Sequence, residues 1–231
     1  MKYIGIIFAM DEELNEFLKL IKIEKEYSIF DLTFHEGKIN DNTSCVLVKS
    51  GVGKVNAARC CQILIDNIKV DYIFNVGVAG GVSKDLKVGD IVIGEKLVQH
   101  DFDITAFNYE KGYIPNVGTY IDCDQYLVKI AKECINKSTS GVIASGDIFC
   151  TELSMGEKIN NKFNALCVEM EGASIAQVCF LSNIPFLVLR SISDTPNNDN
   201  VVTYEEFLKS SSEAIALSMK KIIDKLSSDN L

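Results

Sequence analysis

Short apolar runs rich in β-branched residues alternate with amphipathic stretches along nearly the whole chain, and this alternation limits the folds that the sequence can adopt. Seven of the apolar runs are typical of buried strands: 3–8, 44–49, 72–76, 90–98, 141–144, 166–169 and 186–192. Five stretches repeat apolar residues every three or four positions, as amphipathic helices do: 55–68, 125–135, 155–162, 171–182 and 204–226. The pattern predicts an α/β fold with helices on both faces of a largely parallel or mixed sheet, and ligands bound beyond the carboxyl ends of its strands.

The length of the chain favours one domain spanning residues 1–231. With 231 residues, of which 47% are hydrophobic, it is long enough for one sizeable α/β core and short for two. No linker, change in composition or internal repeat divides it. The one long irregular stretch, 108–122, contains Gly112, Pro115 and Gly118 and is longer than most connections. It can be a lid, a partner contact or a surface excursion.

The balance of charge disfavours polyanionic partners. The chain has 32 acidic and 23 basic residues, and its net charge of -9 opposes binding to nucleic acid or to an anionic membrane surface. No run approaches the roughly 20 apolar residues of a membrane span, and no export signal is evident, so we expect a cytoplasmic protein. The eight cysteines lack CxxC or Cys/His ligand spacing, and we interpret them as reduced, small hydrophobic residues.

Acidic residues follow several of the predicted strands. Asp11, Glu12 and Glu13 come directly after the first strand, where acids can simply supply favourable charge in the first turn of a helix. Glu169 and Glu171 lie one residue apart at the end of a later strand, and helix capping explains one of them but not both. Because a carboxylate in a cleft needs a partner, we expect at least one of this pair to have a function.

The most hydrophobic strand ends in Arg190-Ser191-Ile192-Ser193-Asp194. An arginine at the end of such a strand is costly unless it meets an anion, and Glu169 or Glu171 is the expected partner. Asp194 can cap a turn, but strand ends are the usual position of catalytic groups in such folds. We therefore favour a catalytic role for Asp194.

Glycine-rich segments, 50–54 and 77–81, follow two other strands. Their glycines allow either a tight structural turn or the close approach of a ligand to the backbone. They do not form a Walker motif, because Val55 follows Lys54 and Val48 occupies the position of the early glycine, and no GxGxxG follows. His35 and His100 are the only histidines, and His100 can contact a site or make a structural hydrogen bond. Carboxylates at three strand ends, without a metal or nucleophile motif, suit acid–base chemistry on a neutral polar ligand.

Taken together and in this order, these segments resemble the 5'-methylthioadenosine/S-adenosylhomocysteine nucleosidases of the purine nucleoside phosphorylase superfamily. The similarity extends over nearly the whole chain, through 5–13, 50–58, 75–81, 88–92, 100–107, 145–147, 168–171 and 190–194. It implies a single three-layer α/β/α domain with a central mixed, twisted sheet flanked by helices. It also implies a homodimer, no cofactor, and hydrolysis of methylthioadenosine or S-adenosylhomocysteine to adenine and the thioribose.

The resemblance assigns roles to three acids. Asp194 would protonate N7 of the leaving adenine, Glu13 would activate the attacking water, and Glu171 would hold the ribose hydroxyls. Cleavage builds positive charge on the sugar and negative charge on the base, so these groups would act where charge develops. Asp194 must then be protonated near neutral pH, which predicts a raised pKa and a bell-shaped rate profile.

Further positions of the resemblance line the substrate site. Met170 would lie against the sugar, Arg190 would support the ribose-side carboxylates, and Phe149 with the Cys150 backbone would hold adenine. Val78 stands where many relatives have serine, and Cys150 where an aliphatic residue is common, so the water network and adenine pocket differ in detail. The other expected substrate-binding positions are Glu169, Ser193, Ala79 and Gly80, with an apolar 5'-thioether pocket made by Val52, Ile104, Tyr204 and, from the neighbouring subunit, Phe107 and Pro115.

Several other functions stay open at this point. A phosphorylase of the same superfamily needs arginines that grip phosphate, but 78–81 has none and Arg59 lies beyond the first turn of its predicted helix, so hydrolysis is favoured. Aminofutalosine and 5'-deoxyadenosine remain possible substrates. A nucleoside sensor without catalysis is disfavoured by the presence of Glu13, Glu171 and Asp194, and a structural dimerisation module would leave these carboxylates unexplained.

Overall fold

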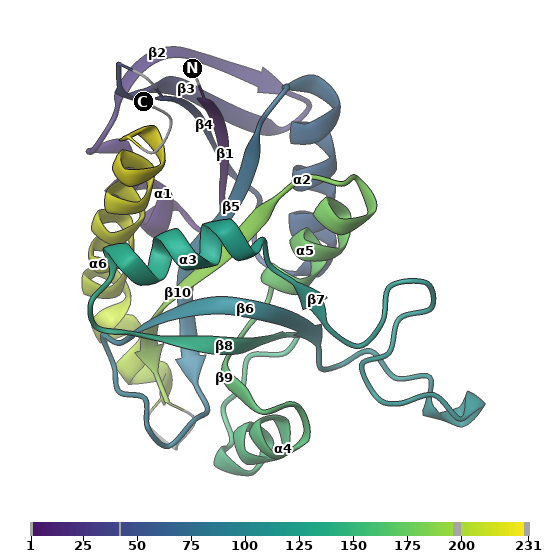
Figure 1. The fold of residues 1–231 in the computed structure, drawn as a ribbon. Helices are drawn as coiled ribbons and strands as arrows, with labels where there is room; N and C mark the ends of the chain where they lie inside the picture. Colours follow the sequence, from purple (N-terminus) through teal and green to yellow (C-terminus); the bar gives the residue numbers. More distant parts are fainter. Residues whose placement is uncertain (1, 42, 196–199, 229–231) are drawn as a thin grey trace.

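Ten strands form one mixed sheet in the computed structural model, which describes residues 2–41, 43–195 and 200–228 (Figure 1). They are β1 (Lys2–Phe8), β2 (Lys22–Ile29), β3 (Leu32–Asn40), β4 (Thr43–Lys49), β5 (Tyr72–Gly81), β6 (Ile91–Gln99), β7 (Ile121–Asp122), β8 (Ser138–Ser145), β9 (Ala165–Glu169) and β10 (Phe186–Asp194). Their order is β10-β6-β8-β9-β5-β1-β4-β3-β2, with β7 beside β6. Because β5 also pairs with β10, five of the strands form a closed circuit, from which β1, β4, β3 and β2 extend as an open sheet.

The central pairings of the sheet are parallel. β1 runs parallel to β4 and β5, and β5 runs parallel to β10. The sheet is mixed because β6 is antiparallel to β10, and β9 is antiparallel to β5. Parallel neighbours end at the same edge, so the residues that follow β1, β4, β5 and β10 are brought together there.

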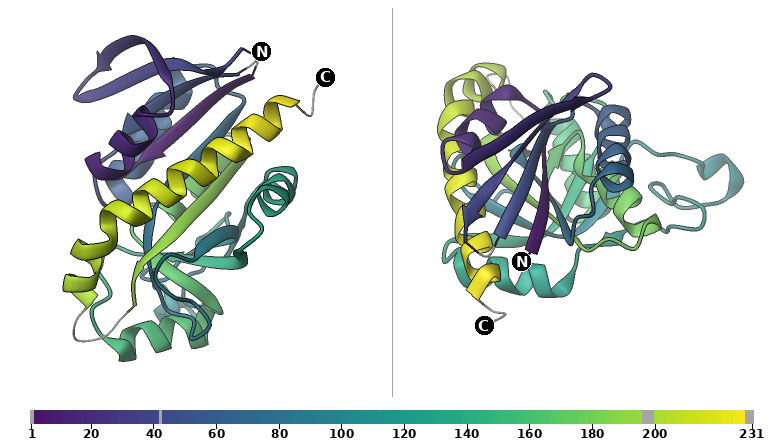
Figure 2. Two further views of the ribbon diagram at one scale, coloured as in Figure 1. Left: turned by 90° about the vertical axis from the view of Figure 1, so that its left-hand side faces the viewer. Right: turned by 90° about the horizontal axis from the view of Figure 1, so that it is seen from above.

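Helices cover both faces of the sheet (Figures 1 and 2). They are α1 (Asp11–Leu18), α2 (Lys54–Asn67), α3 (Gln125–Cys134), α4 (Leu153–Phe163), α5 (Gly172–Leu181) and α6 (Asn200–Ser228), with a short 3-10 helix η1 (Thr105–Phe107). The long helix α6 packs on β10 and β5, with α1 and α3 against it, whereas α2 and α5 pack together on the other side. The predicted α/β architecture of a mixed sheet flanked by helices is confirmed.

The core is formed by strands that are buried along almost their whole length. β1, β4 and β10 have no exposed residue, and apolar residues fill most of β1 and β4 and the first four positions of β10, as expected of strands covered on both faces. Seven of the eight cysteines are buried and none of the eight forms a disulfide, so they pack as small hydrophobic residues. In the part of the chain that the structure describes, no helix is long and apolar enough to cross a membrane.

The structure differs from the sequence-based prediction at four elements that were missed and at one segment that was misassigned. β2, β3, β7 and α1 were not predicted as separate elements. The interpretation of 77–81 as a turn is wrong, because these residues continue β5 to Gly81. The predicted irregular stretch 108–122 is irregular up to residue 120, with one isolated bridge between Ile114 and Gly118, and Figure 1 shows it projecting from the body of the protein.

Candidate active site

A cavity of about 720 Å³, counting its opening to solvent, lies where β1, β5, β9 and β10 end. It brings the three predicted catalytic acids, Glu13, Glu171 and Asp194, to one place. The lining residues are Ala9, Met10, Glu13, Val52, Val78, Ala79, Gly80, Ile148, Phe149, Cys150, Val168, Glu169, Met170, Glu171, Ser193, Asp194 and Tyr204.

Glu13 lies in the first turn of α1 and is 3% exposed. Its Oε2 accepts hydrogen bonds from the amides of Ala9 (2.9 Å) and Met10 (3.1 Å), and its Oε1 accepts one from the Val78 amide (3.0 Å). The side chain therefore caps its own helix and also ties that helix to β5. Burial raises the pKa of Glu13, although the charge of Arg190 and the three amides oppose the shift.

Gly77 makes room for the Glu13 carboxylate. A Cβ at this position would lie 2.4 Å from Glu13 Oε1, closer than real Cβ contacts come. The first glycine of 77–81 is thus required within a strand by the close approach of an acid, which explains why the turn interpretation failed.

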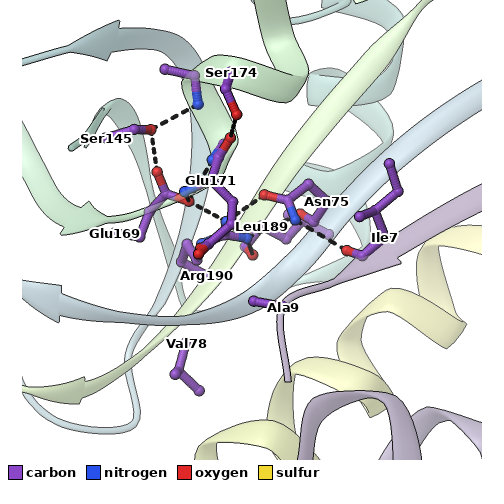
Figure 3. Close-up of polar contacts among 12 residues, drawn as sticks. Ile7, Ala9, Asn75, Val78, Ser145, Glu169, Glu171, Ser174, Leu189 and Arg190 are labelled. Atoms are coloured by element: carbon purple, nitrogen blue, oxygen red, sulfur yellow. Dashed lines mark hydrogen bonds and ion pairs between the residues drawn. The ribbon is translucent and has the colours of Figure 1, made fainter. Parts of the chain in front are cut away.

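Glu169 is the centre of a buried polar network (Figure 3). Its carboxylate accepts hydrogen bonds from the Ser145 hydroxyl and from the amides of Gly172 (2.7 Å) and Glu171 (3.2 Å). It also forms an ion pair with Arg190, which is 1% exposed. The partner predicted for Arg190 as Glu169 or Glu171 is therefore Glu169.

Arg190 is held in place by more than its ion pair. Its guanidinium donates to the side-chain and main-chain oxygens of Asn75 and to the Leu189 carbonyl, and the Asn75 amide donates in turn to the Ile7 carbonyl (3.0 Å) (Figure 3). Burial opposes the charge of Arg190, but the carboxylates of Glu169, Glu171 and Glu13 outweigh it and raise its pKa. Arg190 does not line the cavity but lies behind the acids that do.

Glu171 is the N-terminal cap position of α5 and is 6% exposed. Its Oε1 accepts a hydrogen bond from the Gly53 amide at 2.8 Å. Burial and the neighbouring charge of Glu169 raise the pKa of Glu171 to about 7, while Arg190 and the Gly53 amide act in the opposite direction. This acid therefore changes its charge near neutral pH.

Asp194 is the last residue of β10 and is 2% exposed. The pairing of β10 with β5 shifts register between Ile192 and Asp194, and such a bulge redirects side chains at the end of a strand. Ser193 donates a hydrogen bond to Asp194 Oδ1 at 2.8 Å. A Cβ at Gly80 would lie 3.3 Å from Asp194 Oδ2, so this glycine also leaves room for an acid.

The mouth of the cavity is apolar and aromatic. The rings of Phe149 and Tyr204 meet edge to face at 5.6 Å, and the Tyr204 hydroxyl lies 3.0 Å from the sulfur of Met10. Cys150 is buried, and burial raises the pKa of its thiol to about 11, so it is a neutral lining group. The predicted positions Val52, Val78, Ala79, Gly80, Glu169, Met170 and Ser193 also line the cavity.

Ile104, Phe107 and Pro115 do not line this chain's cavity. Their placement in a 5'-thioether pocket stays a prediction. Sequence reasoning missed four lining residues, Ala9, Met10, Ile148 and Val168. Of these, Ala9, Met10 and Val168 lie in strand-end segments that the sequence had marked, whereas Ile148 had no signal.

Basic residues are absent from the cavity lining in the described part of the chain. Arg190 is occupied by Glu169 and Asn75, and Arg59 lies on α2, paired with Asp31 at the surface. No group of three or more His, Cys, Asp or Glu residues within the described ranges is arranged to hold a metal ion. The geometry gathers buried carboxylates around a cavity that is otherwise lined by apolar residues.

Comparison with known proteins places this arrangement in a family. The profile of the phosphorylase superfamily matches residues 3–226. A 5'-methylthioadenosine/S-adenosylhomocysteine nucleosidase from Staphylococcus carnosus is 40% identical over 228 residues, covering 95% of this chain and 100% of that protein. One from a Geobacillus strain is 38% identical over 229 residues, covering 96% and 98%. The chain belongs to the 5'-methylthioadenosine/S-adenosylhomocysteine nucleosidases of the phosphorylase superfamily.

Solved structures share the fold of this nucleosidase family member over its whole length. An S-adenosylhomocysteine nucleosidase from Streptococcus pyogenes, in complex with 5-methylthiotubericidin, superposes with a TM-score of 0.94 at 36% identity, covering 97% of both chains. A structure of futalosine hydrolase from Helicobacter pylori gives the same TM-score at 35% identity, covering 97% of this chain and 98% of that chain. The family resemblance read from the sequence is confirmed.

Proposed function

We propose that this nucleosidase family member hydrolyses the N-glycosidic bond of 5'-methylthioadenosine and S-adenosylhomocysteine, releasing adenine and the thio-substituted ribose. The observation that carries the proposal is the meeting of Glu13, Glu171 and Asp194 in one cavity with an apolar mouth. The names of the relatives at 37 to 40% identity support the same substrates.

Asp194 acts as the general acid. It protonates N7 of the adenine as the bond between C1' of the sugar and N9 breaks, so that the base leaves as a neutral molecule. Its position at the end of β10, with Ser193 donating to one oxygen, leaves the carboxyl group facing the cavity. This role requires the protonated form near neutral pH.

Glu13 and Glu171 act on the sugar side. Glu13 takes a proton from the water that attacks C1', and Glu171 accepts hydrogen bonds from the ribose hydroxyls. Both carboxylates stabilise the positive charge that the sugar gains as the bond breaks. Arg190 fixes the position of Glu169 and so of the strand end that carries Glu171.

Water, and not phosphate, is the acceptor in this proposal. Phosphate binding in this cavity would need a cationic partner, and the described lining residues include none. The Val78 side chain, where many relatives have serine, adds an apolar group beside Glu13.

The deciding experiment is product analysis of purified protein incubated with methylthioadenosine, with and without phosphate. Adenine and free methylthioribose in equal amounts, whether or not phosphate is present, are the expected result. A sugar 1-phosphate that forms only with phosphate would make the protein a phosphorylase. Binding without any turnover would make it a nucleoside sensor, and Asp194→Asn is the matched variant that should bind substrate and release no adenine.

Aminofutalosine hydrolysis is a second candidate for the same site. It is favoured by the equal structural similarity to the futalosine hydrolase from Helicobacter pylori. Competition between methylthioadenosine and aminofutalosine in one reaction would rank the two by their kcat/KM values. A larger rate for aminofutalosine would replace methylthioadenosine as the main substrate.

We also propose that the protein acts as a cytoplasmic homodimer. Phe107 is 74% exposed and Pro115 is exposed on the projecting segment, and this exposure supports a contact of both with a neighbouring subunit. The absence of disulfides among its eight cysteines suits a reducing compartment. Light scattering measures the molar mass, and so the oligomeric state, of the wild type and of Phe107→Asp. The variant should be monomeric and should have a raised KM for methylthioadenosine.

A further inference from the structure

A cluster of charged residues lies next to the cavity, and the catalytic roles above do not use it. The Lys54 ammonium lies 2.6 Å from Asp101 Oδ1 and donates to Gln99 Oε1 at 3.2 Å. The Lys54 amide donates to Asp147 Oδ1 at 2.8 Å, and the Asp147 amide donates to Asp101 Oδ2 at 2.9 Å. We call Lys54, Asp101 and Asp147 the Lys54 cluster.

The Lys54 cluster joins three segments that are distant in sequence. Lys54 begins α2, Asp101 follows β6, and Asp147 follows β8. The ammonium of Lys54 is largely sheltered, with 16% of its side chain exposed, as is Asp101 with 18%. Burial opposes ionisation of Asp101, but the Lys54 hydrogen bond, the Asp147 amide and the nearby charges prevail and lower its pKa, so Asp101 is ionised at neutral pH. Burial lowers the pKa of the adjacent His100, which is therefore neutral there.

The loop that precedes Lys54 has little rigidity of its own. Gly51 and Gly53 both have positive φ values, +82° and +99°, a region that favours glycine. Glycine loses more conformational freedom on ordering than other residues, so this loop depends on contacts made elsewhere. Asp147 supplies one such contact through the hydrogen bond that it accepts from the Lys54 amide. Its Oδ1 also lies so near Gly53 that a Cβ there would be 3.2 Å away.

The same loop supplies the hydrogen bond that Glu171 receives from Gly53 and also places Val52 in the cavity lining. We propose that the Lys54 cluster is a set of positioning residues that hold the Gly53 amide against the Glu171 carboxylate, and that it acts on sugar binding through this amide. The inference rests on the proposed function, because it takes Glu171 as the acid that binds the ribose. None of the three cluster residues lines the cavity, so none of them touches the substrate there.

The acid limb of the pH profile of kcat/KM distinguishes two effects of the Lys54 cluster on Glu171. One is the positioning of the Gly53 amide, and the other is the charge of Asp101 acting at a distance. The charged groups that face Glu171 are Glu169, Glu13 and Arg190, and the Gly53 amide favours its ionised form. Removing the negative charge of Asp101 would, by Coulomb attraction and repulsion alone, make Glu171 easier to ionise. Loss of the Gly53 hydrogen bond has the opposite effect on Glu171. Asp101→Asn should therefore move the acid limb of kcat/KM to higher pH if the cluster positions the amide.

The experiment measures kcat, KM and the pH profile for methylthioadenosine with the wild type, Asp101→Asn and Asp147→Ala. The matched control is Lys132→Met, which breaks an ion pair of the same length, 2.6 Å, between α3 and β6 and outside the cavity. Because a hydrogen bond to a charged group is worth about tenfold, we expect kcat/KM to fall by about tenfold, mainly through KM, and the acid limb to rise by up to about one pH unit.

Thermal melting of each variant accompanies the kinetics. Asp147 has a half-exposed side chain, so its replacement provides the measurement if Asp101→Asn is poorly folded. An acid limb that is unchanged or moves to lower pH, with a KM equal to that of Lys132→Met, would overturn the inference. Failure of the proposed function is a separate result, because then the wild type itself releases no adenine from methylthioadenosine.

Discussion

The backbone at Gly77 leaves room for the carboxylate of Glu13, the proposed general base, and Gly77→Ala tests what this close approach does. The new Cβ would lie 2.4 Å from Glu13 Oε1, and real Cβ contacts stay above 3.0 Å, so the carboxylate must move by at least 0.6 Å. The backbone at Gly77 does not have a positive φ, so alanine itself is compatible with the strand.

The expected loss follows from that displacement. A misplacement of about 1 Å in a catalytic group can cost about a hundredfold in rate, so a shift of this size should lower kcat/KM by about tenfold to a hundredfold. Crowding of a packed site typically costs about 1–3 kcal/mol of stability. We would follow adenine release for activity and urea unfolding for stability.

Gly141→Ala is the matched control. Its Cβ would lie 2.9 Å from Leu166 Cδ1, a less severe but still crowded contact that involves an apolar side chain and no lining residue of the cavity. Adding Glu13→Asp to Gly77→Ala removes one methylene, so stability should recover while activity should not. If Gly77→Ala keeps kcat/KM within about threefold of Gly141→Ala, the position of Glu13 does not limit the reaction.

Three further predictions concern the buried network and the mouth of the cavity. Arg190→Met should lower the free energy of unfolding by about 3–5 kcal/mol, because it leaves Glu169 charged and unpaired in the interior; urea denaturation measures this, and a loss below about 1 kcal/mol would contradict it. The pKa of Glu171 is raised to about 7, which means that the folded state binds the proton of this acid more tightly than the unfolded state does. The free energy of unfolding should therefore fall as pH rises from about 5 to about 7. Glu171→Gln should reduce that dependence of the melting temperature on pH. Tyr204→Phe removes only a contact to the Met10 sulfur, so kcat/KM for methylthioadenosine should stay within about threefold; a larger loss would show that the hydroxyl contacts the substrate.

The sequence predicted the elements whose residues are buried on both faces, and it missed those at the edge of the sheet. β1, β4 and β10 are long apolar runs, and their positions were predicted to within a few residues. β2 reads Lys-Ile-Glu-Lys-Glu-Tyr-Ser-Ile and is mostly exposed, so no hydrophobic pattern marks it. β2 forms because the outer edge of β3 offers backbone groups for hydrogen bonding. Strand pairing, and not a pattern of side chains, therefore determines this element.

In the candidate site, too, the sequence indicated the side chains but not the backbone groups that hold them. Carboxylates at strand ends were recognisable as candidates, and Glu13, Glu171 and Asp194 do meet in the cavity. The groups that hold them are mainly amides of Ala9, Val78 and Gly53, and any residue type could supply an amide. The sequence therefore indicated which groups carry charge, whereas only the structure shows what keeps each of them in position.

The charges of the cavity explain why this site is costly to build and useful once built. Glu13, Glu169, Glu171 and Asp194 are each at most 7% exposed, and among the described residues Arg190 is the one buried lysine or arginine near them. Glu169 takes that cation directly, so the negative charges of Glu13 and Glu171 are not matched by an ion pair, and burial raises the pKa values of both. A neutral nucleoside does not relieve this strain, but a sugar that becomes positive as its bond to adenine breaks does. The same repulsion that lowers the stability of the folded protein thus favours the transition state over the bound substrate, and a glutamine at position 171 should make the protein more stable and less active.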